Sequence, residues 1–233
     1  MKIGKFWKVS VLEVIPEIVT DLARKEMIDA IKSMAFVDGK KTAGRRAARV
    51  KKNEQVGDAD LSAKKNLQSK ILKALRSNGR FQRFAFPSKI ATPLISRYRP
   101  GMEYGLHVDN ATMADGTIRT DLSVTVFLND AEDYDGGELE IFSGYGPVKI
   151  KLPAGSAVVY PSSSLHRVLP VTHGERLAAV TWVESQIRDP ARREILYDMG
   201  VTRNKLEQDM PEAEETDRAN RAYTNLLRMW TGT

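Results

Sequence analysis

Residues 155–184 read "GSAVVYPSSSLHRVLPVTHGERLAAVTWVE", and this stretch decides the fold. Three short runs in it, "GSAVVYP", "HRVLPV" and "RLAAVTWVE", are rich in β-branched and aromatic residues, and turn-forming residues separate them. Runs of this kind with turns between them are typical of antiparallel strands. The turn "THGE" predicts that the second and third runs pair with each other as a hairpin.

Four similar runs precede this stretch. They are "TPLISRY", "LSVTVFLN", "GELEIF" and "GPVKIKL", and glycine, proline and acidic turns separate them. Many short strands at this spacing favour an antiparallel sandwich or barrel. The middle of the chain is therefore predicted to be a β domain.

Helical patterns flank these strands on both sides. Residues 16–34 carry apolar side chains at helical spacing, with Pro16 in the expected first turn, and residues 62–77 repeat the pattern. After the strands, a helix is expected to start at Pro190, and another is expected near residues 216–230.

Gly200 is expected to end the first of these C-terminal helices. The whole chain is thus predicted to be mainly β with flanking helices (α+β). Its three expected parts are an N-terminal helical support packed on the core (residues 1–87), the β core (88–187) and a C-terminal helical extension (188–233).

Composition excludes several kinds of site. The chain has 233 residues and no cysteine, so disulfides, iron–sulfur clusters and a thiol nucleophile are excluded. A metal would have to be held by nitrogen and oxygen ligands. No signal peptide or membrane-spanning helix is readable, and a cytoplasmic location with no membrane partner is expected.

Charge is distributed unevenly along the chain. The net charge is +6, yet residues 39–53 hold seven basic and no acidic side chains, and residues 129–140 hold six acidic and no basic ones. The plain interpretation of each run is a solvated loop. The functional interpretation of the basic run is a patch that faces an anionic substrate or nucleic acid.

The tripeptide "HVD" at residues 107–109 is the first candidate site. Side chains two residues apart on a strand point the same way, so His107 and Asp109 would lie side by side. No nucleophile elbow of the G-x-S-x-G type accompanies them. A metal therefore fits this pair better than a nucleophilic triad does.

Two further histidines are candidates for a third ligand. His166 lies at the base of a predicted strand, whereas His173 lies in the predicted turn and is expected to be solvated. Two histidines and one carboxylate form the facial triad that leaves open positions on iron(II). His107, Asp109 and His166 are therefore the predicted metal ligands.

Arg176 follows His166 by ten residues. If the "THGE" hairpin forms, Arg176 folds back beside His166. A guanidinium in that place is suited to binding the far carboxylate of a dicarboxylic acid with two hydrogen bonds.

These residues together resemble the iron(II)- and 2-oxoglutarate-dependent dioxygenases of the prolyl-4-hydroxylase type. More closely, the chain resembles bacterial PKHD-type hydroxylases from about residue 36 to the C-terminus. The segments that carry the resemblance are "FVDGKKTAG", "HVDNA", "RTDLSVTVFLND", "DYDGGELEI", "KLPAGSAVVYPSSSLHRVLPVTHGERLA" and "AYTNLLRMW".

The resemblance implies a double-stranded β-helix, or jelly roll. It assigns Fe(2+) to His107, Asp109 and His166, assigns 2-oxoglutarate to Arg176, and makes Tyr98 a candidate contact of that cosubstrate. It implies no catalytic residue beyond the metal centre. The implied reaction consumes O2, hydroxylates a C–H bond and releases succinate and CO2, with L-ascorbate as an accessory reductant of some members.

The expected substrate is a small molecule or a peptidyl side chain, and a homodimer is compatible with the sequence. Asn110 and the loop 110–120 are expected to form one wall of the substrate mouth, and the basic run 40–52 the other. Lys51 and Lys52 are both expected to affect the KM of the substrate.

Three alternatives remain open. A cupin is also a metal-binding jelly roll, but it would leave Arg176 without a role. A nucleic-acid demethylase of the same superfamily would suit the basic charge, but such enzymes carry a second arginine where this chain has Trp182. A non-enzymatic basic binding module would use residues 39–53, and nucleic acid is not the expected partner.

Overall fold

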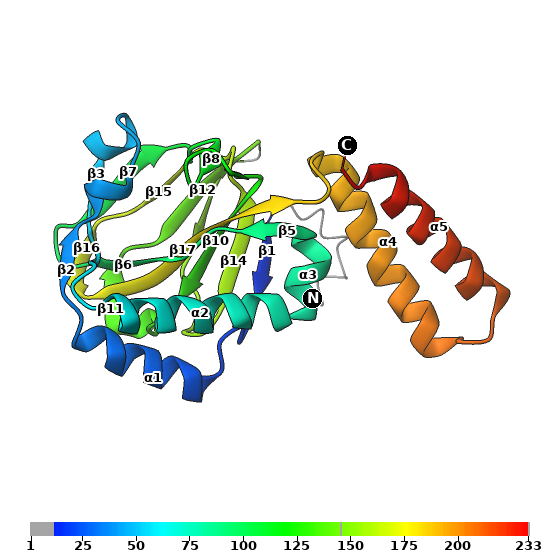
Figure 1. Cartoon of the computed structure of the whole chain (residues 1–233), viewed down its shortest axis with the longest axis horizontal. Coiled ribbons are helices and arrows are strands. Elements are labelled where there is room, and N and C mark those ends of the chain that lie inside the picture. The colour runs from blue at the N-terminus through cyan, green and yellow to red at the C-terminus, as the bar shows by residue number, and fades with distance from the viewer. Residues whose placement is uncertain (1–11, 145, 233) are drawn as a thin grey trace, which may run out of the picture.

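A computed structural model describes residues 12–144 and 146–232. Two antiparallel sheets face each other, and helices cover the outer side of one of them (Figure 1). This is the arrangement of a jelly-roll core, so the predicted mainly β fold with flanking helices is confirmed.

The major sheet has the strand order β1-β14-β10-β17-β6-β4-β2, with β5 paired to β17. Its strands are β1 (Glu13–Ile15), β2 (Phe36–Asp38), β4 (Glu54–Val56), β5 (Pro87–Ile90), β6 (Leu94–Tyr98), β10 (Leu122–Phe127), β14 (Ala157–Pro161) and β17 (Arg176–Ser185). β10 and β14 are buried on both faces, because helices pack on one side and the minor sheet on the other.

The minor sheet has the order β13-β12-β15-β7-β3. Its strands are β3 (Lys51–Lys52), β7 (Glu103–His107), β12 (Leu139–Ser143), β13 (Gly146–Ile150) and β15 (His166–Val168). Two small ladders complete the β structure, pairing β8 (Thr112–Met113) with β9 (Ile118–Arg119) and β11 (Tyr134–Gly136) with β16 (Val171–Gly174). Short helical turns lie at η1 (Gly39–Thr42), η2 (Ala47–Arg49) and η3 (Ala131–Asp133).

Three helices support the major sheet, namely α1 (Asp21–Lys32), α2 (Leu61–Ser77) and α3 (Gly79–Ala85) (Figure 1). Apolar faces of these helices share one core cluster with strand residues of the major sheet. α1 begins after the cap residue Thr20, not at Pro16, and Glu17 between them has a left-handed backbone (φ 49°) that no helix adopts.

The C-terminal helices α4 (Pro190–Asp209) and α5 (Glu214–Trp230) form a hairpin beside the β core (Figure 1). The prediction that Gly200 ends a helix is wrong, because α4 continues through it. A Cβ at Gly200 would lie 3.2 Å from the Tyr223 ring, so the glycine lets α5 pack closely on α4.

The N-terminal region is less purely helical than its sequence indicates. β1, β2 and β4 extend the major sheet, and β3 forms an edge of the minor sheet. Residues 1–11, where the expected N-terminal support begins, lie outside the described residues. None of the helices in the described part of the chain has the length and apolar character needed to cross a membrane.

The predicted hairpin between "HRVLPV" and "RLAAVTWVE" is also wrong. β15 pairs with β12 and β7 in the minor sheet, whereas β17 pairs with β10, β6 and β5 in the major sheet. The chain crosses between the sheets through β16, whose partner is β11. Residues at the two ends of this crossing therefore face each other across the sandwich.

Candidate metal centre and its cavity

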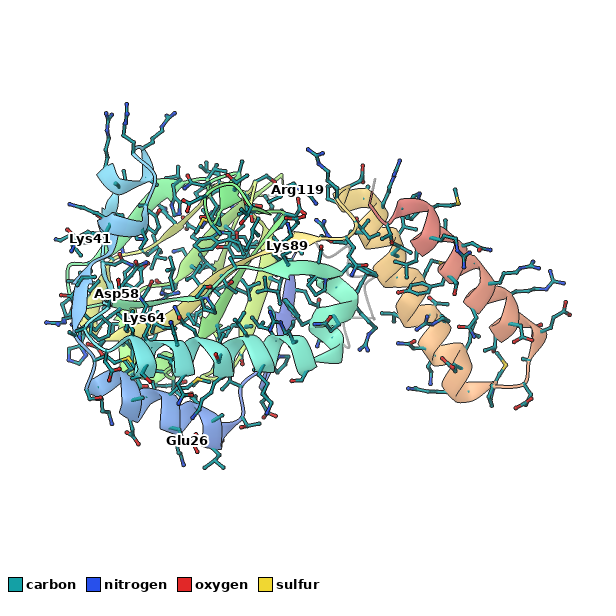
Figure 2. All side chains as sticks on the ribbon, in the orientation of Figure 1. Glu26, Lys41, Asp58, Lys64, Lys89 and Arg119 are labelled. Carbon is teal, nitrogen blue, oxygen red and sulfur yellow. The ribbon has the colours of Figure 1, made fainter. Side chains whose placement is uncertain are left out.

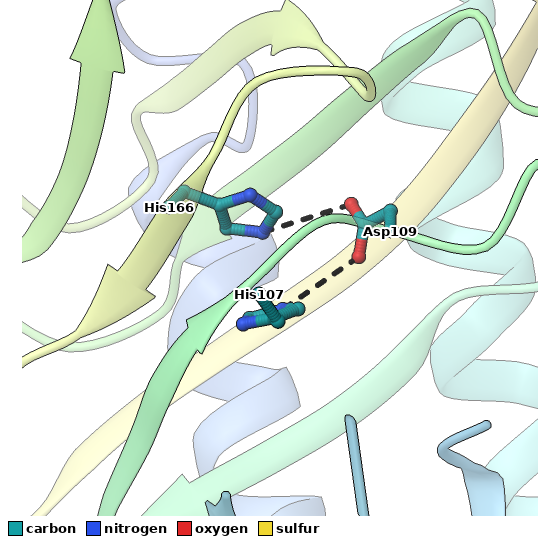
Figure 3. A group of neighbouring side chains, drawn as sticks. All are labelled: His107, Asp109 and His166. Atoms are coloured by element: carbon teal, nitrogen blue, oxygen red, sulfur yellow. Dashed lines mark ion pairs between the residues drawn. The ribbon is translucent and has the colours of Figure 1, made fainter. Parts of the chain in front are cut away.

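His107 and His166 come together because β7 and β15 are neighbours. The two histidines are direct partners in this antiparallel ladder, and their ring centroids lie 4.3 Å apart. Asp109 lies just past the end of β7, and its carboxylate closes the group (Figure 3). One potential ligand atom from each of the three residues lies within 4.8 Å of the others.

The gaps between these atoms suit an ion better than direct hydrogen bonds. The Nε2 atom of His107 is 3.8 Å from one carboxylate oxygen of Asp109, and the Nε2 atom of His166 is 3.7 Å from the other (Figure 3). A hydrogen bond between nitrogen and oxygen would be about 2.7–3.2 Å long. The arrangement thus fits the predicted facial triad.

Backbone carbonyls fix the orientation of both imidazoles. The Nδ1 atom of His107 lies 2.8 Å from the Gly105 oxygen, and that of His166 lies 2.9 Å from the Ser164 oxygen. A carbonyl accepts only, so each Nδ1 carries the proton and each Nε2 presents a lone pair. This is the tautomer that a metal requires.

Electrostatics favour the neutral ligand form of His107. Burial, together with the nearby imidazole of His166, lowers the pKa of His107 from 6.5 to about 4. The Tyr104 ring stacks on His107 at 3.6 Å, and Tyr160 meets His166 edge to face. The His107 imidazole is therefore unprotonated at neutral pH. Aromatic contacts hold both imidazole rings in place.

Ser123, on β10 of the opposite sheet, orients the carboxylate. Its hydroxyl donates a 2.6 Å hydrogen bond to Asp109, and it also contacts the Ser162 hydroxyl at 2.8 Å. The sequence analysis missed Ser123, because an alternating strand pattern does not reveal which polar residue faces a site.

Arg176 and Tyr98 lie in the same cavity as the three ligands. They are direct partners of the β17–β6 ladder, and the guanidinium carbon is 5.1 Å from the Tyr98 ring centre. Burial raises the pKa of Tyr98, and the charge of Arg176 opposes the rise. Arg176 arrives from across the sandwich and not through the hairpin that the sequence analysis expected.

Arg176 is only 1% exposed and forms no ion pair with any described residue. Its Nε atom has no hydrogen-bond partner, and neither does the nearby hydroxyl of Tyr134. A buried charge without a counter-charge costs several kcal/mol. A bound carboxylate would satisfy it, so the donor set fits 2-oxoglutarate as well as iron.

The other expected site segments are divided between the cavity and the surface. The cavity lining includes Asn110 and Met113 from the loop 110–120 and several residues of the basic run 40–52. Both segments that were expected to form walls of the substrate mouth therefore reach the cavity. Lys51 is 5% exposed and lines the cavity, whereas Lys52 is exposed. His173 is exposed on β16, which agrees with its expected solvation.

Two family models cover most of the folded chain. Residues 93–184 match the 2OG-Fe(II) oxygenase superfamily, and residues 190–232 match the PKHD-type hydroxylase C-terminal domain. A PKHD-type hydroxylase of Picosynechococcus sp. is 45% identical over 93% of this chain and 98% of its own length. One from Klebsiella pneumoniae is 43% identical over 93% of this chain and 97% of its own.

Solved structures support the fold at low identity. A prolyl hydroxylase from Trichoplax adhaerens, in complex with a hypoxia inducible factor peptide fragment, aligns with a TM-score of 0.56 and 20% identity over 81% of this chain and 87% of its own. A 2OG-Fe(II) oxygenase family oxidoreductase from Burkholderia pseudomallei aligns with a TM-score of 0.51 and 19% identity over 73% and 84%.

The cupin and non-enzymatic alternatives fail on this evidence, and Trp182 stands in the cavity wall where a demethylase would have its second arginine. The family reaction requires Fe(2+), 2-oxoglutarate and O2, and the described triad fits the metal. The chain belongs to the PKHD-type hydroxylase family of 2-oxoglutarate- and Fe(II)-dependent dioxygenases.

Proposed function

We propose that this chain hydroxylates an unactivated C–H bond of a small molecule or peptidyl side chain in the cytoplasm, with His107, Asp109 and His166 as the ligands of Fe(2+). When bound, ferrous iron supplies the redox chemistry that couples O2 and 2-oxoglutarate to substrate hydroxylation, with succinate and CO2 as by-products. The observation that carries the proposal is the convergence of the three ligand atoms within 4.8 Å in a cavity that also holds the unpaired Arg176.

The protein's own groups have separate tasks. The two Nε2 lone pairs and the Asp109 carboxylate would hold the metal, and all three residues line the cavity into which substrates would enter. Arg176 binds the far carboxylate of 2-oxoglutarate through charge-assisted hydrogen bonds. Tyr98 lies beside that guanidinium and forms part of the wall against which the cosubstrate lies.

Apolar side chains of the cavity exclude bulk water. Leu94, Val180 and Trp182 come from the major sheet, and Leu139 and Val168 come from the minor sheet. Exclusion of water protects reactive species from side reactions. L-Ascorbate would serve as a reductant that returns the metal to its ferrous state, as it does for some members of this type.

The test is an anaerobic Fe(2+) titration followed by measurement of succinate released from 2-oxoglutarate in air. The wild-type protein is expected to bind one iron and to release succinate, and Asp109→Asn to lose at least about 100-fold in both. Asp115→Asn makes the same chemical change at an exposed position of the neighbouring turn and should behave as wild type. Iron binding that survives in Asp109→Asn, or wild-type protein that takes up no iron, would refute the proposal.

A further inference from the structure

The segment 51–55, "KKNEQ", turns alternate polar side chains into the cavity. Lys51 is 5% exposed, and Asn53 and Gln55 are each 4% exposed. Lys52 between them is exposed, and Glu54 is half-buried in an ion pair with Arg97. Buried positions in a β core normally carry apolar residues, so three buried polar side chains at alternate positions mark a part of the cavity wall that meets something polar.

Lys51 and the metal ligand His107 both contact the Tyr104 ring. The Nζ atom of Lys51 is 5.1 Å from the centre of the Tyr104 ring, which stacks on His107. Its hydrogen-bond partner is the Thr42 hydroxyl at 3.3 Å, and it forms no ion pair within the described part of the chain. Burial lowers the pKa of Lys51 to about 8, so the ammonium remains mostly charged at neutral pH.

Asn53 is also unsatisfied. No residue in 12–144 or 146–232 forms a well-aligned hydrogen bond with its amide nitrogen or its amide oxygen. The amide does lie close enough to the Tyr98 hydroxyl to interact with it and to lower its pKa. A buried amide without partners lowers stability, because it has lost its hydrogen bonds to water. Lys51 at the start of β3 and Asn53 just after β3 thus present an ammonium without an ion-pair partner and an unsatisfied amide to the same cavity.

A surface groove leads to this wall of the cavity. Its lining includes the basic side chains of Arg45, Arg46 and Arg49 and the aliphatic side chains of Val50, Leu106, Val108 and Leu165. The three arginines are exposed and form no ion pair with any residue in 12–144 or 146–232 (Figure 2 shows basic side chains that project from the η1–η2 segment). Gly44, Ala47 and Asn110 line both the groove and the cavity.

We infer that Lys51 and Asn53 form a subsite for a carboxylate of the substrate, and that the substrate is an organic acid with an apolar body. The inference rests on the proposed function, which already occupies both ends of 2-oxoglutarate with iron and Arg176. No charged group of the cosubstrate is left for Lys51, so a second carboxylate has to come from the substrate. Lys52 takes no part, because it faces solvent.

The experiment uses monocarboxylic acids and their primary amides as probes, which differ in charge but not in shape. The pairs are hexanoate and hexanamide, N-acetylleucine and its amide, and N-acetylphenylalanine and its amide. Calorimetry measures their binding to anaerobic protein loaded with Fe(2+) and 2-oxoglutarate, and mass spectrometry in air measures any gain of one oxygen. Acids are expected to bind at least about tenfold more tightly than their amides.

Lys51→Met and Lys52→Met are the matched variants. Lys51→Met should remove the preference for acids while leaving 2-oxoglutarate binding unchanged, and Lys52→Met should behave as wild type. Lys51→Arg keeps the charge and should keep the preference, which separates charge recognition from packing. Asn53→Leu should reduce acid binding by a smaller factor.

Three results would overturn the inference. They are equal binding of acid and amide or no binding of either, an acid preference that survives in Lys51→Met, and a loss of 2-oxoglutarate affinity in Lys51→Met that assigns the lysine to the cosubstrate. Uncoupled succinate release is measured in the same samples. If the wild type releases none, the proposed function fails; if it releases succinate but shows no acid preference, only the subsite fails.

Discussion

The two ends of the cavity are built in different ways. At the metal end, short strands of the minor sheet position the ligands. The carbonyls of Gly105 and Ser164 accept hydrogen bonds from the two imidazoles, and the Ser123 hydroxyl donates one to Asp109, so every ligand is held in place before a metal arrives. At the anchor end, the long buried strand β17 of the major sheet carries Arg176, whose guanidinium has no counter-charge among the residues that the structure describes. The metal end is preorganised, whereas the anchor end stays unsatisfied until a ligand binds.

The variant with the largest expected effect is Arg176→Met, which tests whether the anchor end of the cavity is unsatisfied until a ligand binds. We expect the KM for 2-oxoglutarate to rise about 100-fold, because two charge-assisted hydrogen bonds are lost. The free energy of unfolding of the metal-free protein should stay the same or increase, because an uncompensated buried charge is removed. Succinate kinetics and chemical denaturation measure the two quantities.

Arg99→Met is the control, since Arg99 follows β6 at a half-exposed position and pairs with Glu54. It should leave the KM unchanged. If Arg176→Met instead unfolds the protein, the anchor end is structural and the contrast is wrong.

The second test concerns protonation at the metal end. The pKa of His107 is about 4 in the folded state, against 6.5 in an unfolded chain, so between these values the unfolded state binds more protons. Stability of the metal-free protein therefore falls as pH falls from about 6.5 to 4, by about 1–2 kcal/mol between pH 7 and pH 5 from this group.

Denaturation of chelator-treated protein at these two pH values measures this loss, which His107→Leu should reduce. His173→Leu, at the exposed histidine of β16, should retain the wild-type loss. Identical pH dependence in all three proteins would show that burial of His107 carries no such cost.

The smallest expected effect is that of Ser123→Ala. Loss of the hydrogen bond to Asp109 should weaken Fe(2+) binding about tenfold, because groups that orient a metal ligand affect affinity less than the ligand itself. Ser162→Ala, one hydrogen bond further from the metal, should have a weaker effect still. A larger loss in Ser162→Ala than in Ser123→Ala would contradict this order. Metal titration with a competing chelator provides the measurement.

Much of the fold could be predicted from patterns that strands and helices impose. The runs around β10, β14 and β17 are long and apolar enough to be recognised, and α2 was expected at almost its observed bounds. β1 to β4 were not predicted, because strands of two or three residues have no readable period and are stabilised by distant partners.

The residues of the site can likewise be divided into those that the sequence predicted and those that it did not. His107, Asp109 and His166 are rare residue types in a recognisable pattern, so sequence alone brought them together. Ser123 and Asn53 are common residue types, and only the folded structure shows that Ser123 contacts Asp109 and that Asn53 lines the cavity. Lys51 and Lys52 were expected to act together at the substrate mouth, but only Lys51 turns inward, and the strand that separates their directions is only two residues long.

The direct pairing of His107 with His166 has a further consequence. A single ion held by both would cross-link β7 and β15, which are far apart along the chain. Cross-links of this kind stabilise the native state by an amount that grows with the logarithm of the free metal concentration. Iron scarcity would then do more than silence the enzyme, because the unmetallated chain would open more often and become an easier substrate for cellular proteases.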